Sequence, residues 1–243
     1  MIYYQQGSET DVLTSHDLRE ALYSALNQLG ERKKVLAVPP DFTRFHSRAG
    51  ELTAMASEYY GNKLTDVLPA LGTHSPMTPE QIHKMFPGVP DSLFRVHDWR
   101  NDIVTLGKVP ANYISSITEG RINDEWPVQV NKMINEGGHD LILSIGQVVP
   151  HEVIGMANYN KNIFVGTGGA DGINKSHFIG AAYGMERIMG RASNPVRKVL
   201  NYASEEFASH LPILYALTVI GHDPKSNLVP RGTCIGNNKK VTN

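Results

Sequence analysis

The sequence predicts an α/β fold in which a mainly parallel sheet is flanked by helices. Two observations support this prediction: short apolar runs typical of buried strands recur along the chain, and helical segments alternate with them. The clearest runs lie at residues 35–38, 64–71 and 140–145. Because helical connections keep such strands parallel, we expect their carboxyl ends to meet at one edge of the sheet.

Helical periodicity begins early in the chain. Leucines and alanines recur on one face from about Ser15, and Gly30 follows as a common helix stop. Residues 86–126 are less regular, and we interpret them as an insertion or a pair of short antiparallel strands. Further helices are expected over residues 47–60, 128–136, 177–190 and 195–209.

The composition is that of an ordinary globular protein. The chain has 243 residues, of which 41% are hydrophobic and 19% charged, and its net charge is -1. This balance, without basic clusters, argues against nucleic acid or a membrane surface as a main partner. No apolar run approaches the ~18 residues that a membrane span needs. Cys234 is the only cysteine, so no internal disulfide can form, and a cytoplasmic location is expected.

Polar side chains follow three of the predicted strands. Asp41 and Arg44 follow the first strand, His74 the second and His151 the third. Taken singly, each has an ordinary structural explanation, such as a hydrogen-bonded histidine or an ion pair that stabilises a turn. Their occurrence at successive strand ends is more informative, because parallel strands bring such ends together. We therefore expect these side chains to share one site.

The segment after the third strand carries further candidate groups. Lys161 lies ten residues beyond His151, and His177 lies sixteen residues beyond Lys161. Between them, residues 166–172 are rich in glycine and could turn their backbone amides toward a ligand. A lysine, two histidines and such a turn around one strand end indicate a binding or catalytic site.

Three short motifs mark the ends of the predicted strands. They are Pro-Asp-x-Thr-Arg at residues 40–44, Gly-Thr-His at residues 72–74 and Val-Val-Pro-His at residues 148–151. With Lys161 and His177 behind them, they resemble the nickel-pincer-dependent lactate racemase family. In that family the catalytic histidine precedes the cofactor-bearing lysine by ten residues and the nickel-ligating histidine by twenty-six, as His151 does here. The resemblance covers residues 10–220 and implies the N-terminal catalytic domain of a two-domain racemase.

The resemblance implies a role for each candidate side chain. His74 and His151 would be acid/base catalysts on opposite faces of the substrate. Lys161 would hold a nickel pyridinium-3,5-bisthiocarboxylic acid mononucleotide through a thioamide, and His177 would ligate the nickel. Arg44 would bind the substrate carboxylate. The implied activity is that of a racemase or epimerase, which inverts the α-carbon of a 2-hydroxy acid by reversible hydride transfer.

The remaining assignments concern the orientation of the site residues and the binding of the cofactor. Asp41 would assist substrate binding by orienting Arg44 or one of the histidines. The cofactor phosphate would lie on Thr43, on Ser47 or on the glycine-rich turn; in that turn the candidates are Gly168 and Gly169. Cofactor-biosynthesis proteins would be transient partners, and protein made without them is expected to lack the cofactor.

The implied chemistry agrees with these residue types. Hydride removal from a 2-hydroxy acid, while a base takes the hydroxyl proton, gives a flat 2-keto acid that can be reduced again on either face. Histidine suits this work because its unperturbed pKa is about 6.5. No amino-acid side chain accepts hydride, so a cofactor is required. Arginine can bind a carboxylate through two parallel hydrogen bonds.

The sequence departs from the family pattern close to the lysine. Residues 156–160 read Met-Ala-Asn-Tyr-Asn, where the lactate racemase has serine and glycines. Ser75 replaces a frequent arginine, and Phe42 lies between Asp41 and Thr43. We therefore expect the reaction class to hold and the substrate to be a larger 2-hydroxy acid, such as a sugar acid.

The chain is expected to divide near residue 210. Residues 1–210 would form the α/β cofactor-binding and catalytic domain, and residues 211–243 would begin a C-terminal domain. Family members carry a second domain that closes over the site and supplies a further lysine. We therefore expect this chain alone to turn over poorly and the missing domain to raise the rate greatly.

Two interpretations from other classes remain open. His74, His151 and His177 could together bind zinc and activate water, although this leaves Lys161 without a role. Alternatively, the chain could be a non-catalytic domain that binds a nucleotide-like ligand at residues 166–172. The identity of a bound metal would separate the first interpretation from a nickel racemase, and activity would separate the second.

Overall fold

The central element of the structure is a six-stranded sheet in the order β1-β10-β9-β6-β2-β3. The computed structural model describes residues 1–223 and 227–237. The strands of the sheet are β1 (Ile2–Gly7), β2 (Val35–Val38), β3 (Leu64–Val67), β6 (Leu141–Gln147), β9 (Ile213–Asp223) and β10 (Asn227–Asn237). Strands β3, β2, β6 and β9 are parallel, whereas β10 and β1 are antiparallel to their neighbours. The predicted α/β fold with a mainly parallel sheet is confirmed.

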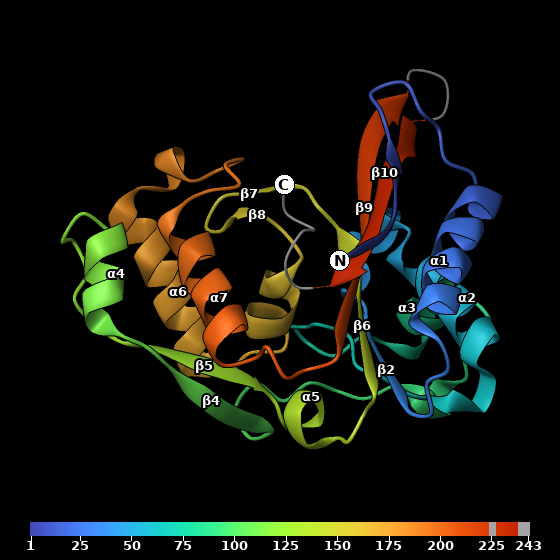
Figure 1. The fold of residues 1–243 in the computed structure, drawn as a ribbon, viewed down its shortest axis with the longest axis horizontal. Helices are drawn as coiled ribbons and strands as arrows, with labels where there is room; N and C mark the ends of the chain where they lie inside the picture. The colour runs from blue at the N-terminus through green and yellow to red at the C-terminus, as the bar shows by residue number, and fades with distance from the viewer. Residues whose placement is uncertain (224–226, 238–243) are drawn as a thin grey trace.

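Helices cover both faces of the sheet (Figure 1). One face packs against α1 (Ser15–Leu29), α2 (Ala49–Tyr60) and α3 (Pro79–Met85), and the other faces α6 (Ala170–Tyr183) and α7 (Pro195–Glu206). Successive strand residues point to opposite faces. Leu36 and Val38 therefore enter the core beneath α6 and α7. Val35 and Ala37 enter the core beneath α1 and α2.

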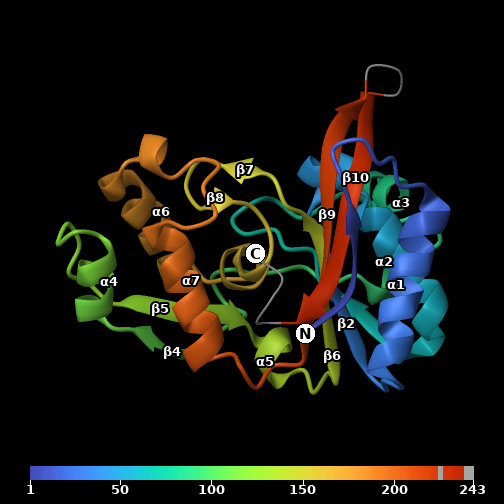
Figure 2. The same cartoon turned by 45° about the horizontal axis from the view of Figure 1, so that its top comes forward.

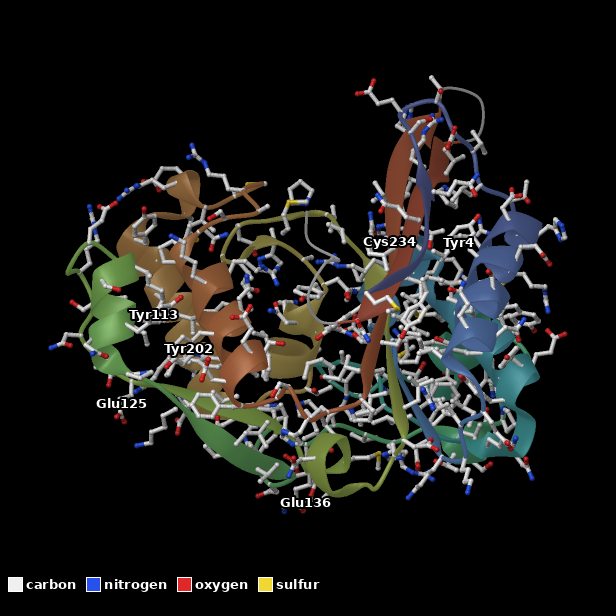
Figure 3. The ribbon with its side chains drawn as sticks, viewed as in Figure 1. Tyr4, Tyr113, Glu125, Glu136, Tyr202 and Cys234 are labelled. Atoms are coloured by element: carbon white, nitrogen blue, oxygen red, sulfur yellow. The ribbon has the colours of Figure 1, made fainter. Side chains whose placement is uncertain are left out.

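A smaller layer lies along one side of α6 and α7 (Figure 2). It contains the antiparallel pair β4 (Ile103–Val109) and β5 (Trp126–Asn131), with α4 (Ala111–Ile117) between them in sequence and α5 (Lys132–Glu136) after them. The rings of Tyr113 on α4 and Tyr202 on α7 lie 4.6 Å apart and join the two helices (Figure 3). Two short strands, β7 (Pro150–His151) and β8 (Gly155–Met156), pair with each other near the end of β6.

Polar residues begin the helices as the sequence indicates. At α1 the Thr14 hydroxyl accepts the Asp17 amide at 3.2 Å, and the Asp17 carboxylate accepts the Thr14 amide at 2.7 Å. This reciprocal pair is a capping box. At α7 the Asn194 side chain accepts the Arg197 amide at 3.0 Å, and Pro195 occupies the first helical position. Both helix starts are thus specified locally.

One stretch of predicted helix is a strand. Residues 126–131 form β5, and only residues 132–136 of the helix predicted at 128–136 are helical. Val128 and Val130 are buried and alternate with half-buried neighbours, which is the period-two pattern of a strand. The predicted antiparallel pair exists, but its second strand begins at Trp126 and so extends past residues 86–126.

The helix predicted from His177 begins earlier, at Ala170, so His177 lies within α6. Part of the glycine-rich stretch is therefore helical, and its glycines allow close packing. A Cβ atom added at Gly172 would lie 3.2 Å from the Pro127 carbonyl oxygen of β5. The absence of a side chain at this position lets α6 approach β5.

Strands β9 and β10 pair with each other in antiparallel orientation within the central sheet. Strand β9 pairs with β6, and β10 pairs with both β9 and β1. The assignment of residues 211–243 to the beginning of a second domain stays a prediction, and residues 224–226 and 238–243 of that segment lie outside the described residues. Over the described ranges, no helix has both the length and the apolar character needed to cross a membrane.

Candidate active site

A cavity of about 280 Å³ lies at the carboxyl edge of β2, β3 and β6. The three strands run parallel, so the loops that follow them reach the same edge. The side chains that the sequence singles out and that line this cavity are Asp41, Thr43, Arg44, His74, His151, Lys161 and His177. The structure therefore brings residues from five separate segments of the chain to a single site.

Asp41 holds the first of the two histidines. It follows β2 and begins a short 3₁₀ segment, Phe42–Ser47, by accepting the Thr43 amide at 3.1 Å. Its second carboxylate oxygen lies 2.5 Å from Nδ1 of His74. A carboxylate only accepts hydrogen bonds, so Nδ1 of His74 carries a proton and Nε2 keeps its lone pair. The carboxylate is buried, whereas the His74 side chain is 60% exposed and free to meet a ligand.

His151 is held in the opposite tautomer. Its Nδ1 accepts the backbone amide of Val153 at 3.2 Å and that of Ile154 at 3.4 Å. The neutral ring therefore carries its proton on Nε2. Burial, and after it the positive charge of Lys161, lowers the pKa of His151 to about 4. At neutral pH, His151 is therefore uncharged and offers a donor at Nε2.

Lys161 directly precedes a π-helical turn, Asn162–Gly166, on the wall of the cavity. Burial, and after it the positive charge of Arg44, lowers the pKa of Lys161 to about 8. Near that pH a large share of the amine is neutral, and the neutral amine is the nucleophilic form. Lys161 is thus suited to form a covalent bond through its nitrogen.

We expect Lys161 to react with acylating reagents at a lower pH than exposed lysines do. Only the neutral amine reacts, so labelling of Lys161 should be half-maximal near pH 8. Peptide mass spectrometry over a pH series measures this midpoint, and exposed lysines, with an ordinary pKa of about 10.4, are the internal controls. A midpoint shared with the exposed lysines would show that burial does not perturb Lys161.

His177 also has a defined tautomer. Its Nδ1 lies 2.8 Å from the Ile173 carbonyl oxygen, one turn earlier on α6, and 3.2 Å from the Ser176 hydroxyl. A carbonyl only accepts hydrogen bonds, so Nδ1 carries the proton and Nε2 keeps its lone pair. A backbone carbonyl that fixes one ring nitrogen is the usual arrangement behind a metal-bound histidine.

The other predicted residues divide between the cavity and the interior. Arg44 lines the cavity at a break in the 3₁₀ segment, where its φ is -109° and its ψ is 30°. Gly168 and Gly169 are buried and do not belong to the cavity lining. A Cβ atom added at Gly169 would lie 2.6 Å from the Gln129 side chain of β5. These two glycines serve close packing, and their placement gives no support to a contact with a cofactor phosphate.

Three amide side chains line the cavity without having been assigned a role from the sequence. Gln147 ends β6 and is buried, and within the described chain its Oε1 has no hydrogen-bond partner. Asn162 donates to the Val38 carbonyl at 2.9 Å and to the Ser144 hydroxyl at 3.1 Å, which ties the π-helical turn to the sheet. Asn158 is the third. An isolated amide has no distinctive sequence pattern, although Gln147 directly precedes the Val-Val-Pro-His motif.

The histidines do not form a metal site by themselves. Among residues 1–223 and 227–237, no three His, Cys, Asp or Glu side chains are grouped so that they could hold a metal ion. The zinc interpretation requires His74, His151 and His177 around one ion, and the arrangement does not support it. A single ligand such as His177 would need its other donors from a bound molecule.

Known structures share this fold. A protein of Thermotoga maritima with a crystal structure superposes with a TM-score of 0.81 at 29% identity, over 94% of this chain and 56% of that chain. The lactate racemase apoprotein from Thermoanaerobacterium thermosaccharolyticum superposes with a TM-score of 0.65 at 21% identity, over 97% of this chain and 50% of that chain. This chain thus spans about half the length of either protein.

The family is established by sequence. A comparison with curated proteins gives no match. Residues 14–187, well over half of the chain, match the lactate racemase N-terminal domain. This segment contains every cavity-lining residue that the motifs singled out, from Asp41 to His177. The chain therefore belongs to the family of the lactate racemase N-terminal domain.

Proposed function

We propose that the chain binds the cofactor and the substrate of a racemase or epimerase that inverts the α-carbon of 2-hydroxy acids. The observation that carries this proposal is the meeting of two histidines, one arginine and one lysine of lowered pKa around one small cavity. A carboxylate ligand, an acid/base pair and a covalent anchor are the groups that such a reaction requires. The chain spans about half the length of the solved structures that it matches, so the proposal concerns the part of the site that this chain carries.

The residues present fit a nickel pyridinium-3,5-bisthiocarboxylic acid mononucleotide. Lys161 offers a nucleophilic amine that can bond to an acyl-type carbon of this group. His177 offers Nε2 with its lone pair, and imidazole nitrogen suits nickel. The buried Oε1 of Gln147, unpartnered within the described chain, offers an acceptor to a bound molecule. When bound, the group would supply the hydride acceptor that no side chain provides.

Arg44 and His74 act on the substrate in this proposal. The guanidinium of Arg44 binds the substrate carboxylate through two parallel hydrogen bonds. His74 accepts the hydroxyl proton at Nε2, and the buried carboxylate of Asp41 stabilises the imidazolium that forms. The Asp41 contact therefore fixes the direction in which the His74 ring faces.

His151 performs the same step for the other enantiomer. With its proton on Nε2, it donates a hydrogen bond to the substrate oxygen. To act as a base it must carry its proton on Nδ1, which requires the amide contacts from Val153 and Ile154 to open. Conversion of Lys161 to an uncharged amide-type group removes one of the positive charges that lower the pKa of His151. With Lys161 held in such an uncharged form, the pKa of His151 would be lowered less.

The reaction class can be tested with an α-deuterated 2-hydroxy acid. We expect the cofactor-loaded protein to interconvert the enantiomers in ordinary water while the α-deuterium stays on carbon, because hydride does not exchange with solvent. Chiral chromatography coupled to mass spectrometry measures both quantities, with lactate and a sugar acid compared as substrates. Loss of deuterium to solvent would indicate α-proton abstraction instead. Binding of the nucleotide without any interconversion would favour the carrier interpretation.

A further inference from the structure

The segment Met156–Lys161 that presents the lysine has an unusual backbone. Asn158 and Tyr159 are consecutive non-glycine residues with positive φ angles of 63° and 57°. L-amino acids rarely adopt this left-handed conformation, so surrounding contacts must hold it. The segment is also thin: Ala157 lines the cavity described above and a second, larger cavity on its other side. Packing holds the middle of this loop, where the ring centroids of Tyr159 and Tyr215 lie 4.5 Å apart.

Arg197 donates hydrogen bonds to both ends of this loop. It lies on α7, it is only 5% exposed, and its guanidinium donates from one nitrogen to the Met156 carbonyl and from another to Oδ1 of Asn160. The Asn160 side chain also donates to Oδ1 of Asn201, one turn further along α7, at 2.7 Å. Asn160 is fully buried and is followed directly by Lys161. The planar fork of one guanidinium therefore fixes the distance between the start of the loop and its end.

The partners of Arg197 are unusual for a buried cation. Within the part of the chain that the structure describes, Arg197 takes part in no ion pair with Asp or Glu, and both acceptors of its guanidinium are neutral. Burial of a guanidinium without a carboxylate is costly, so a purely structural role would be served better by an apolar residue. We infer that the loop depends on the planar geometry of the guanidinium and not on its charge alone.

We propose that Arg197 is a positioning residue, which holds the strained loop of residues 156–160 so that the amine of Lys161 stays on the dry wall of the cavity. The significance of this role for catalysis rests on the proposed function, but the role itself concerns the cofactor-free protein. Without the two hydrogen bonds from Arg197, the loop relaxes and water reaches the amine of Lys161. The amine then becomes harder to deprotonate, because hydration favours its charged form.

The test is the pH profile of Lys161 acylation in the cofactor-free chain, followed by peptide mass spectrometry. In R197M, labelling of Lys161 at pH 8 should fall by about tenfold or more, since a lysine restored to its ordinary pKa is mostly charged there. R197K should behave like R197M, because an ammonium keeps the charge but cannot span two separated acceptors in a plane. K198M is the matched control: Lys198 is the next residue on α7 and is exposed, and its loss should leave the Lys161 profile unchanged.

The outcomes separate geometry from charge. A parent-like profile in R197K with a shifted profile in R197M would show a charge effect only and would overturn the positioning role. Parent-like profiles in both would overturn it as well. If circular dichroism shows that the Arg197 variants do not fold, N160A removes one acceptor and keeps the cation. A shifted pH profile of Lys161 acylation in N160A then supports the positioning role of Arg197, and an unchanged profile contradicts it.

This experiment is independent of cofactor chemistry. A failure of the proposed function would appear as a chain that shows the expected Lys161 profile yet acquires no nucleotide. A failure of the positioning role would appear as unchanged labelling in the variants, whether or not the loaded protein racemises a 2-hydroxy acid.

Discussion

Replacing Lys161 with alanine should eliminate racemisation. In the proposed reaction Lys161 is the covalent anchor of the hydride acceptor, and the cavity wall offers no second lysine to replace it among the described residues. Tight non-covalent binding could retain some nucleotide, but washing would then deplete it. We therefore expect interconversion of the enantiomers to fall below detection in Lys161→Ala after dialysis, as measured by chiral chromatography.

Two further variants show whether the effect is specific. Lys161→Arg keeps a positive charge but offers a guanidinium in place of a nucleophilic amine, so it should be as inactive as the alanine variant. Lys198→Ala removes an exposed lysine of α7 and should retain the parent rate. Full activity of Lys161→Arg would mean that Lys161 acts only by its charge, and the anchoring role would then be wrong.

Replacing His74 with glutamine should lower the rate of racemisation by about 10²–10⁴-fold, the range typical of a lost general acid/base. Glutamine preserves hydrogen bonding but cannot accept the hydroxyl proton. Asp41→Asn should also lower the rate, because an amide neither stabilises an imidazolium nor specifies the Nδ1–H tautomer of His74. Both losses are expected mainly in kcat, since neither side chain is proposed to bind the substrate carboxylate.

The chain contains a matched control for this pair. His83 and Asp91 form a second His–Asp contact of 2.9 Å, exposed and outside the cavity. His83→Gln removes the same chemistry from a place that the proposed reaction does not use, and its rate should equal that of the parent. A similar loss in His83→Gln and His74→Gln would point to a general destabilisation of the chain, and a parent-like rate in His74→Gln would exclude His74 as a base.

Much of the site could be predicted from the sequence because topology constrains it. Strands of a parallel sheet end at one edge, so Asp41, His74 and His151 had to approach one another once the strands were identified. The resemblance to a known family, through the spacing from His151, added Lys161 and His177. These are consequences of short-range patterns, apolar runs and the residues that terminate them.

Other features depend on contacts that the sequence does not reveal. The opposite tautomers of His74 and His151 follow from a carboxylate in one case and two backbone amides in the other. Arg197 reaches its acceptors from a helix more than thirty residues further along the chain. The helical start at Ala170 was missed because glycines, which usually weaken helices, are tolerated there to let α6 approach β5.

The strand β5 was mistaken for a helix for a related reason. Within residues 126–136, the alternation of buried valines typical of a strand is followed directly by a short helix. A single stretch of sequence therefore contains both a strand pattern and a helix pattern. Pairing with β4 decides the outcome, and a single sequence does not show that partner. The antiparallel pair of β9 and β10 likewise extends the central sheet through pairings with β6 and β1.

The most direct test of the proposed site is the intact mass of the chain after co-expression with the cofactor-biosynthesis enzymes and a supply of nickel. We expect an increment of one modified mononucleotide, which peptide mapping assigns to Lys161 and which is accompanied by bound nickel. The increment should be absent from Lys161→Ala. An unmodified parent chain, produced in a host that loads a known family member, would contradict the covalent nickel-pincer site and leave the cavity with a different ligand.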